Sequence, residues 1–413
     1  MSFQKDKLIL RELAAALADI AALPVQEEKR ALWRGLNSLR PGRPMVAIDQ
    51  VCWNEMDIDD TLTLRCEDEE LRGYESRMRR KLFQWKHFPG DMVVEPFVTV
   101  DKAIHNAGYG LSRREVVLAT DPQNAIVAHR YEDILKDDDD LEAITVPVVT
   151  HDAVETERRM AVAREVFDGL LEVCAEGAAL HLQLWDPISQ YKGVENALFA
   201  LADDPEFVHR IVARMVKSFI GMLDQLEEQC LLIEPRLQTL VHCTGAYTDE
   251  LPTPGYVPGK ARCRDLWIAG QAQMFSSVSA AMHKEFDIDY CRPIFERYGR
   301  VYYGCCEPLD RKLEVVTTIP NLRKVSMSPW TQTERGAEGL GRRFVFSCKP
   351  NPAHLAASSF DETVVRNELS GIKAACDRHG CPLEFILKDI STLKYEPGRL
   401  FRWAEIAMEV AGA

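Results

Sequence analysis

The second half of the chain alternates short apolar runs with longer amphipathic stretches, and this rhythm limits the folds that it can adopt. Strands that alternate with helices over short connections form parallel sheets. At least five such units favour an α/β fold of the closed (β/α)8 type, a TIM barrel, over an open sheet. The expected strands are 45–51, 92–100, 181–185, 238–243, 265–273, 300–304, 323–328, 343–348 and 383–387, and the later expected helices are 280–298, 309–318, 362–379 and 397–410.

Two further helices are expected before the first strand. Apolar residues recur at helical spacing from residue 5 to residue 39, with an interruption at Pro24. A turn rich in proline and glycine then ends at Pro44. We therefore predict an N-terminal helical extension at 1–43 and a TIM-barrel catalytic domain at 44–413.

Charge and hydropathy exclude several classes of protein. The net charge of −14 and the pI near 5.3 argue against nucleic-acid binding, which relies on basic surface. No apolar run is long enough to span a membrane, and the first residues lack the apolar core of a signal peptide, so we expect a cytoplasmic protein. In a reducing compartment most of the twelve cysteines would be small buried hydrophobes. No GxGxxG or P-loop pattern follows a predicted strand, which removes support for nucleotide binding.

The strongest candidate for a functional site follows the strand predicted at 300–304. Residues 301–310 read Val-Tyr-Tyr-Gly-Cys-Cys-Glu-Pro-Leu-Asp, so Cys305, Cys306 and Glu307 come directly after a buried strand. Enzymes with parallel sheets keep their chemistry at this position. Successive side chains of a strand point to opposite faces, so only one of the two cysteines faces the barrel axis if the strand continues. We favour Cys306 for that place.

Other predicted strands also end in groups that can carry chemistry. His242, next to Cys243, is either a metal ligand or a hydrogen-bonded structural group. Asp389 is either an acid/base group or the cap of the following turn. Further candidates are Cys348 as a metal ligand or a core cysteine, Gln273, Lys349 and Asn351 as polar contacts to a substrate, and Trp53, Trp185 and Trp330 as pocket walls or rim packing.

Several motifs of the chain occur in an order that resembles a known superfamily. They are Asp265-Leu-Trp, Val278-Ser, Gly-Cys-Cys-Glu, Val-Ser-Met-Ser-Pro-Trp330 and Ser-Cys-Lys-Pro-Asn-Pro352. This order resembles the uroporphyrinogen decarboxylase-like superfamily and, within it, the branch of corrinoid-dependent (cobalamin-associated) methyltransferases. Two departures matter. Residues 40–60 lack the arginine-rich segment of true decarboxylases, and the His-x-Cys of zinc methyltransferases is replaced by Tyr303-Gly304-Cys305-Cys306.

The resemblance implies a TIM barrel that moves a methyl group between a small methylated substrate and a corrinoid, as the demethylase component of a methyltransferase. It implies zinc assistance, with ligands drawn from Cys306, Cys305, His242 and Cys348. We expect Glu307, Asp389 and Gln273 as catalytic groups.

Alternative functions and partners follow from the same resemblance. The chain has no Asp-x-His-x-x-Gly segment, so a corrinoid would arrive on a separate corrinoid-binding protein. The alternatives are a metal-free decarboxylase or lyase and a non-catalytic barrel that holds a tetrapyrrole or corrinoid. A homodimer is expected by analogy alone.

Overall fold

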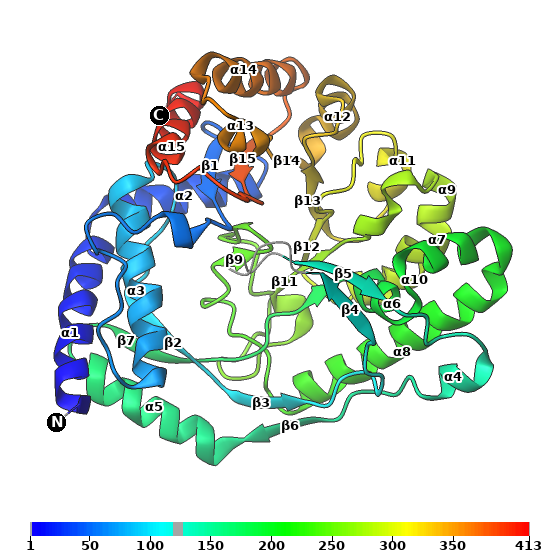
Figure 1. Ribbon diagram of the computed structural model, residues 1–413, viewed down its shortest axis with the longest axis horizontal. Helices are drawn as coiled ribbons and strands as arrows, with labels where there is room; N and C mark the ends of the chain where they lie inside the picture. Colours follow the sequence, from blue (N-terminus) through cyan, green and yellow to red (C-terminus); the bar gives the residue numbers. More distant parts are fainter. Residues whose placement is uncertain (1, 119–126, 413) are drawn as a thin grey trace.

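The computed structural model describes residues 2–118 and 127–412, and its centre is a seven-stranded sheet. Every neighbouring pair of strands in this sheet is parallel, which confirms the parallel sheet predicted from the alternation of elements. Figure 1 shows these strands in the middle of the molecule with helices around them. The strands, in their order across the sheet, are β1 (Met45–Ile48), β15 (Leu383–Leu387), β14 (Val345–Cys348), β13 (Leu322–Met327), β12 (Arg300–Tyr303), β11 (Trp267–Gly270) and β8 (His181–Leu182).

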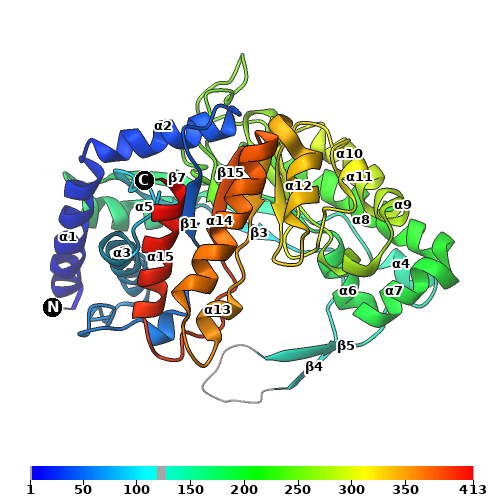
Figure 2. The same ribbon diagram turned by 90° about the horizontal axis from the view of Figure 1, so that it is seen from above.

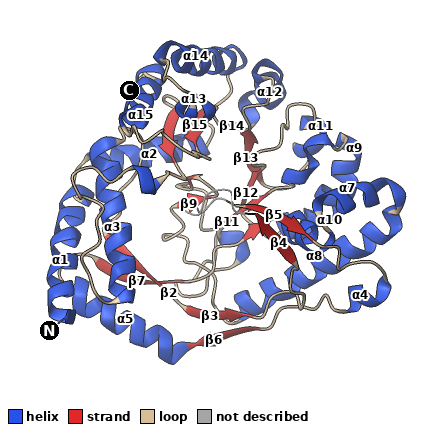
Figure 3. Ribbon diagram, viewed as in Figure 1, coloured by secondary structure: helices blue, strands red, loops and turns tan. Residues whose placement is uncertain are grey.

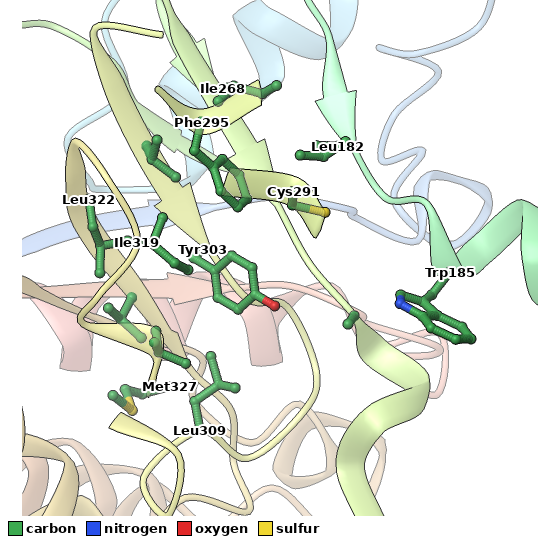
Figure 4. Packing of buried hydrophobic residues seen from close by; sticks show 14 of the residues in the cluster. Leu182, Trp185, Ile268, Cys291, Phe295, Tyr303, Leu309, Ile319, Leu322 and Met327 are labelled. Atoms are coloured by element: carbon green, nitrogen blue, oxygen red, sulfur yellow. The ribbon is translucent and has the colours of Figure 1, made fainter. Parts of the chain in front are cut away.

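Helices of the second half cover the outer face of this sheet. The helix α15 (Gly398–Ala411) contacts β1 and packs on α14 (Glu362–His379), which in turn packs on α12 (Thr333–Leu340). Burial on both faces explains why the strands are almost continuously apolar, and all five residues of β15 are buried. Figure 4 shows Tyr303 in the outer apolar layer with Phe295 and Leu309. The other helices of this half are α9 (Ala280–His283), α10 (Asp289–Phe295), α11 (Leu313–Val316) and α13 (Ala353–Ala356), with a π-helical turn at Lys284–Ile288 between α9 and α10.

Helices of the first half break where proline occurs. The predicted interruption at Pro24 separates α1 (Ser2–Ala21) from α2 (Val25–Asn37). Pro205 begins α8 (Pro205–Glu228), where the missing N–H costs nothing, and the Asp204 carboxylate accepts the Phe207 N–H at 3.1 Å. The remaining helices are α3 (Glu69–His87), α4 (Asp138–Glu142), α5 (Ala153–Phe167), α6 (Trp185–Lys192) and α7 (Val194–Asp203). The division into an extension at 1–43 and a domain at 44–413 stays a prediction.

The described residues form no closed barrel. In the seven-stranded sheet β1 pairs only with β15, and β8 pairs only with β11. At the free edge of β1, Asp91 donates its N–H to the Val46 carbonyl and its carboxylate accepts the Val46 N–H, both at 2.8 Å. The next strand, β2 (Phe97–Asp101), starts after Pro96 and pairs with β7 (Glu172–Glu176). The observed fold is a mixed α/β fold with a parallel sheet.

Four predicted strands are much shorter in the structure: only Trp267–Gly270 of 265–273 is strand, 92–100 is strand only from Phe97, and the other two lie near the site. The stretch predicted at 181–185 keeps only two strand residues, because Trp185 begins α6. The stretch predicted at 238–243 contains only β9 (Leu240–Val241), which turns back through His242 and Cys243 into β10 (Thr244–Gly245). His242 has a φ of 55°, as a tight hairpin turn requires. A short polar turn thus replaces the expected strand end.

The other strands form two antiparallel pairs outside the central sheet. Figure 2 shows β4 (Glu115–Leu118) and β5 (Ala128–Tyr131) as an antiparallel pair that projects from the body of the molecule, and Figure 3 shows both in red as strands. The second pair is β3 (Ala103–Asn106) with β6 (Val149–Asp152). Across residues 2–118 and 127–412, we find no helix with the length and apolar character needed to cross a membrane.

Candidate active site

The candidate site begins where β12 ends. Gly304 has a φ of 99°, and a Cβ added there would lie 2.5 Å from Leu309 Cδ1 and 3.1 Å from Ser326 Cβ. The chain therefore leaves the strand at Gly304, and the two sulfurs that follow lie 3.5 Å apart. Cys305 is buried and Cys306 is exposed. The strand ends before either residue, so the alternation on which the choice of Cys306 rested does not apply, and that choice stays a prediction.

A lysine at the end of β15 meets the buried sulfur. Lys388, only 4% exposed, directs its ammonium to Cys305 Sγ at 3.1 Å and to Asp389 Oδ2 at 3.5 Å. The Cys306 thiol, by hydrogen bonding, and the Lys388 charge lower the pKa of Cys305 to about 7, although burial opposes them. Cys306, which also lies 3.7 Å from Asp389 Oδ2, has a raised pKa through its hydrogen bond to Cys305 and through burial. The pair therefore presents one thiolate and one thiol near neutral pH.

Glu307, predicted as a catalytic group, holds the loop that carries the cysteines. Its carboxylate accepts the Cys305 N–H at 3.0 Å and the Ala272 N–H at 3.3 Å. The side chain is fully buried, and burial raises its pKa. Glu307 thus ties the loop after β12 to the loop after β11.

The end of β14 contributes a second buried ammonium group. Lys349, 3% exposed, donates to Tyr302 Oη at 2.7 Å and to Ser347 Oγ at 2.9 Å. Burial lowers the pKa of Lys349, whereas Cys243, Tyr302 and Glu384 raise it on balance. In the described part of the chain, Lys349 has no carboxylate within ion-pairing distance. Two neutral hydroxyls leave one ammonium N–H for a ligand.

Two imidazoles face the same region. The ring centroids of His181 and His242 lie 5.1 Å apart, and the His242 ring lies 5.1 Å from that of Tyr302. Burial, with the charge of Lys388, lowers the pKa of His181 to about 4. Burial, with the charges of Lys349, His181 and Lys388, lowers the pKa of His242 to about 2. Both rings are neutral at pH 7, and each has a buried Nε2 without a hydrogen-bond partner among the described residues.

Asp49, which directly follows β1, is a member of the site that the sequence reasoning missed. Burial raises its pKa, while a backbone hydrogen bond and the charges of Lys388 and Lys349 act in the opposite direction. Asp49 lies inside the strand predicted at 45–51, and only the earlier end of β1 at Ile48 makes it a strand-end residue. His181, Lys388 and Tyr302 were likewise visible as strand residues or strand ends but were not chosen.

A buried ion pair forms the floor beneath these groups. Lys324 on β13 and Glu384 on β15 are both fully buried, with 2.8 Å between Nζ and Oε2. Thr244 donates its hydroxyl to Glu384 Oε2 at 2.7 Å and accepts from Lys324 at 3.0 Å. The two charges pair with each other in the core, next to the buried ammonium group of Lys349.

Beside the site lies a cavity of about 290 Å³ that shares Asp49 and Cys243 with it. Its walls come from β1, from the segment before β2 and from the β9–β10 hairpin, and they are mostly apolar. This volume is near the lower end of the range for small-molecule sites. The apolar walls include Trp33, Phe88 and Tyr247.

The four predicted metal ligands do not come together. Cys305 and Cys306 are adjacent, and His242 lies in the same region. Cys348 is buried on the opposite face of β14 from Ser347 and Lys349, in the outer core. Within residues 2–118 and 127–412, no group of three or more His, Cys, Asp or Glu side chains is arranged to hold a metal ion. The donor set therefore does not fit zinc, and the metal stays a prediction.

The remaining predicted site residues lie in different parts of the structure. Trp185 is core, with its indole N–H on the Phe286 carbonyl at 3.2 Å. Trp330 is 75% exposed, and Trp53 packs on Phe83 with ring centroids 6.1 Å apart. Asn351 accepts the Ala353 N–H at 3.0 Å, and Gln273 begins the 3₁₀ turn Gln273–Ser277. Of these residues, only Asp389 contacts the groups at the ends of β12 and β15, through Cys306 and Lys388.

Comparison with solved structures identifies a likeness of the whole fold. A methyltransferase from Methanosarcina mazei superposes on the chain with a TM-score of 0.53 and 12% sequence identity. The match covers 93% of this chain and 98% of that chain. No protein-family model and no curated protein sequence matches the chain. At this identity the likeness concerns the fold.

Proposed function

We propose that this protein is a methyltransferase of the corrinoid-dependent branch of the uroporphyrinogen decarboxylase-like superfamily, with a barrel-type fold. It moves a methyl group between a small methylated substrate and a corrinoid carried by a separate protein. Support comes from the strand-end motifs and from the full-length likeness of fold to a methyltransferase. The observation that carries the proposal is the buried amino group of Lys349, which donates to the hydroxyls of Tyr302 and Ser347.

The chemistry of methyl transfer explains why a buried cation is useful. When the methyl group leaves a heteroatom of the substrate, the bonding electron pair stays on that heteroatom. The free N–H of Lys349 can donate to this atom, and the low local dielectric makes the interaction stronger than in water. In the opposite direction, the same ammonium group stabilises the substrate anion that accepts the methyl group. This assigns to Lys349 the part that zinc plays in the related enzymes.

The neutral imidazoles supply hydrogen-bond acceptors in the same place. His242 has an unpartnered Nε2 and stays neutral at pH 7, so it can accept a hydrogen bond from a substrate hydroxyl, thiol or ammonium group and orient it. The corrinoid, when its carrier protein docks, supplies the cobalt that gives or takes the methyl group. No step in this account passes through zinc.

The experiment uses free methylcobalamin as the methyl donor. Wild-type protein is mixed with methylcobalamin and a panel of small thiols, phenols and amines, and the loss of the methylcobalamin absorbance is followed with methylated product. Product formed only with protein supports the proposal. If no member of the panel is methylated, and methylated members of the same classes do not methylate cob(I)alamin, the proposal is wrong.

A second function has one observation in its favour. Two ammonium groups, Lys349 and Lys388, are at least nine-tenths buried at the mouth of the sheet, and such groups also fit a substrate carboxylate. A decarboxylase would release carbon dioxide from a carboxylated substrate and would leave methylcobalamin intact. Measuring both products in one reaction separates the two functions.

A further inference from the structure

The adjacent cysteines at the end of β12 have a geometry that methyl transfer does not require. Their sulfurs lie 3.5 Å apart, so a disulfide between them requires a movement of about 1.5 Å together with some backbone strain. Cys306 is exposed, so a small oxidant can reach the pair, and Lys388 lies 3.1 Å from Cys305 Sγ on the buried side. A thiolate stabilised by a lysine and adjacent to an accessible second thiol is the arrangement of redox-sensitive cysteines.

We propose that Cys305 and Cys306 form a redox-active vicinal dithiol, which hydroperoxides oxidise to a disulfide between the two neighbours. This site is separate from the proposed methyl transfer and does not rest on it. Its substrate class is a small hydroperoxide, and its reductant is a dithiol or another low-molecular-weight thiol.

The chemistry balances over two steps. The Cys305 thiolate attacks the terminal oxygen of the hydroperoxide, which breaks the O–O bond, forms a sulfenic acid and releases water or an alcohol after protonation. The Cys306 thiol then attacks the Cys305 sulfur, which forms the S–S bond and releases water. The two thiols lose two electrons and two hydrogens, and the peroxide gains them.

Chain geometry makes this disulfide easy to reverse. Neighbouring Cα atoms across a trans peptide are about 3.8 Å apart, below the usual span of disulfides of about 4.4–6.8 Å. A strained and accessible disulfide is reduced more readily than a structural one. The pair therefore cycles instead of locking the fold. Lys388, which loses its thiolate partner on oxidation, still has Asp389 Oδ2 at 3.5 Å.

A second cysteine pair in the chain provides an internal comparison. Cys376 and Cys381 are also neighbours in space, but both are buried and no lysine ammonium contacts either sulfur in the described part of the chain. Their hydrogen bond and burial raise the pKa of Cys376. A pair without a lysine contact and without access should resist hydroperoxide. The expected order of oxidation is therefore Cys305–Cys306 first.

The test is a peptide map of the full-length protein. Reduced protein is exposed to a small excess of hydrogen peroxide, its free thiols are capped with N-ethylmaleimide, and it is digested with trypsin. Cleavage after Arg300 and Arg311 yields one peptide with both cysteines. We expect this peptide to be lighter than its dithiol form by two hydrogens, to carry no maleimide, and to revert with dithiothreitol. The Cys376–Cys381 pair should stay capped, and since Arg378 separates the two on digestion, its peptides cannot be confused with the first.

Variants make the result decisive. In Cys306→Ser, Cys305 should form the sulfenic acid but no disulfide, and excess peroxide should oxidise it further to the sulfinic acid. In Lys388→Met, oxidation should slow at least about tenfold at pH 7, because the thiolate fraction falls. A melting curve checks that each variant folds. If wild-type peptide 301–311 carries two maleimides after peroxide treatment, or if it reaches sulfinic or sulfonic acid without the disulfide, the proposal is overturned. Loss of methyl transfer with an intact disulfide response, or the reverse, separates this proposal from the proposed function.

Discussion

The ammonium group of Lys388 lies 3.1 Å from the sulfur of Cys305, although the two residues end different strands of the sheet. The contact joins the loop after β12 to the loop after β15. It also helps to lower the pKa of Cys305 to about 7. Among the described cysteines with a shifted pKa, Cys305 is the one whose pKa lies near neutrality. The relationship can be measured, because a thiolate reacts with alkylating agents and a thiol does not.

Replacing Lys388 with Met should raise the pKa of Cys305 from about 7 toward the ordinary value of 9.0. Alkylation of Cys305 by iodoacetamide, located by tandem mass spectrometry, reports that pKa as the midpoint of a pH–rate profile. Lys373→Met is the matched control, since Lys373 pairs with Asp377 on the surface of α14. An unchanged midpoint in Lys388→Met would contradict the assigned contact.

The buried pair Lys324–Glu384 should show strong coupling in a double-mutant cycle. Lys324→Met leaves an uncompensated carboxylate in the core and should cost about 3–5 kcal/mol of unfolding free energy. Glu384→Leu strands the lysine and should cost a similar amount. The double variant should cost much less than the sum of the two, which denaturant unfolding measures. Additive costs would mean that the two charges are not paired.

Acid should destabilise the protein through His181 and His242. Their folded pKa values of about 4 and about 2 lie below the ordinary 6.5, so the unfolded chain binds protons first as the pH falls. Stability from these groups is complete above about pH 6.5 and is lost toward pH 4, with a slope of at most about 1.4 kcal/mol per pH unit for each ring. Denaturant unfolding of the His181→Asn, His242→Gln variant should show a shallower loss over this window. An equal slope in wild type and variant would refute the buried neutral imidazoles.

Gly304→Ala should destabilise the fold, whereas Gly371→Ala should not. The first adds a Cβ at a φ of 99° against Leu309 and should cost about 1–3 kcal/mol. The second adds a Cβ in α14 with nothing within 4 Å and should be stabilising by up to about 1 kcal/mol. Thermal melts of both variants measure this difference in stability. If Gly304→Ala is no less stable than the wild type, the chain does not turn at Gly304 as described.

Much of the sheet was predictable because periodicity and breakers act locally. The strand at 383–387 and the helix at 362–379 have the predicted bounds, and the breaks at Pro24 and Pro205 occur where a missing N–H requires them. The stretch from Gly304 to Glu307 shows where local reasoning ends. The end of a strand determines which residues lie at the carboxyl edge of the sheet. The positive φ of Gly304 then determines which of the two sulfurs is buried.

The site partners were less predictable because they depend on distant segments. Lys388 is separated from Cys305 by 83 residues, and nothing in either motif specifies the other. His242 reaches the site through a hairpin turn that replaced the expected strand end. Trp185 and Trp330 both follow predicted strands, yet one is core and the other surface. At the edge of β1, the Val46 N–H donates to the carboxylate of Asp91, which lies 45 residues further along the chain.

The most direct test of the account is the rate of methyl transfer from methylcobalamin by Lys349→Met, once the panel has identified a substrate. Lys373→Met serves as the surface control, and melting curves confirm that both variants fold. We predict that the Lys349 variant loses about 10²–10³-fold in kcat, while the control keeps the wild-type rate. A Lys349→Met protein that folds and transfers methyl groups at the wild-type rate would contradict the role assigned to the buried ammonium group.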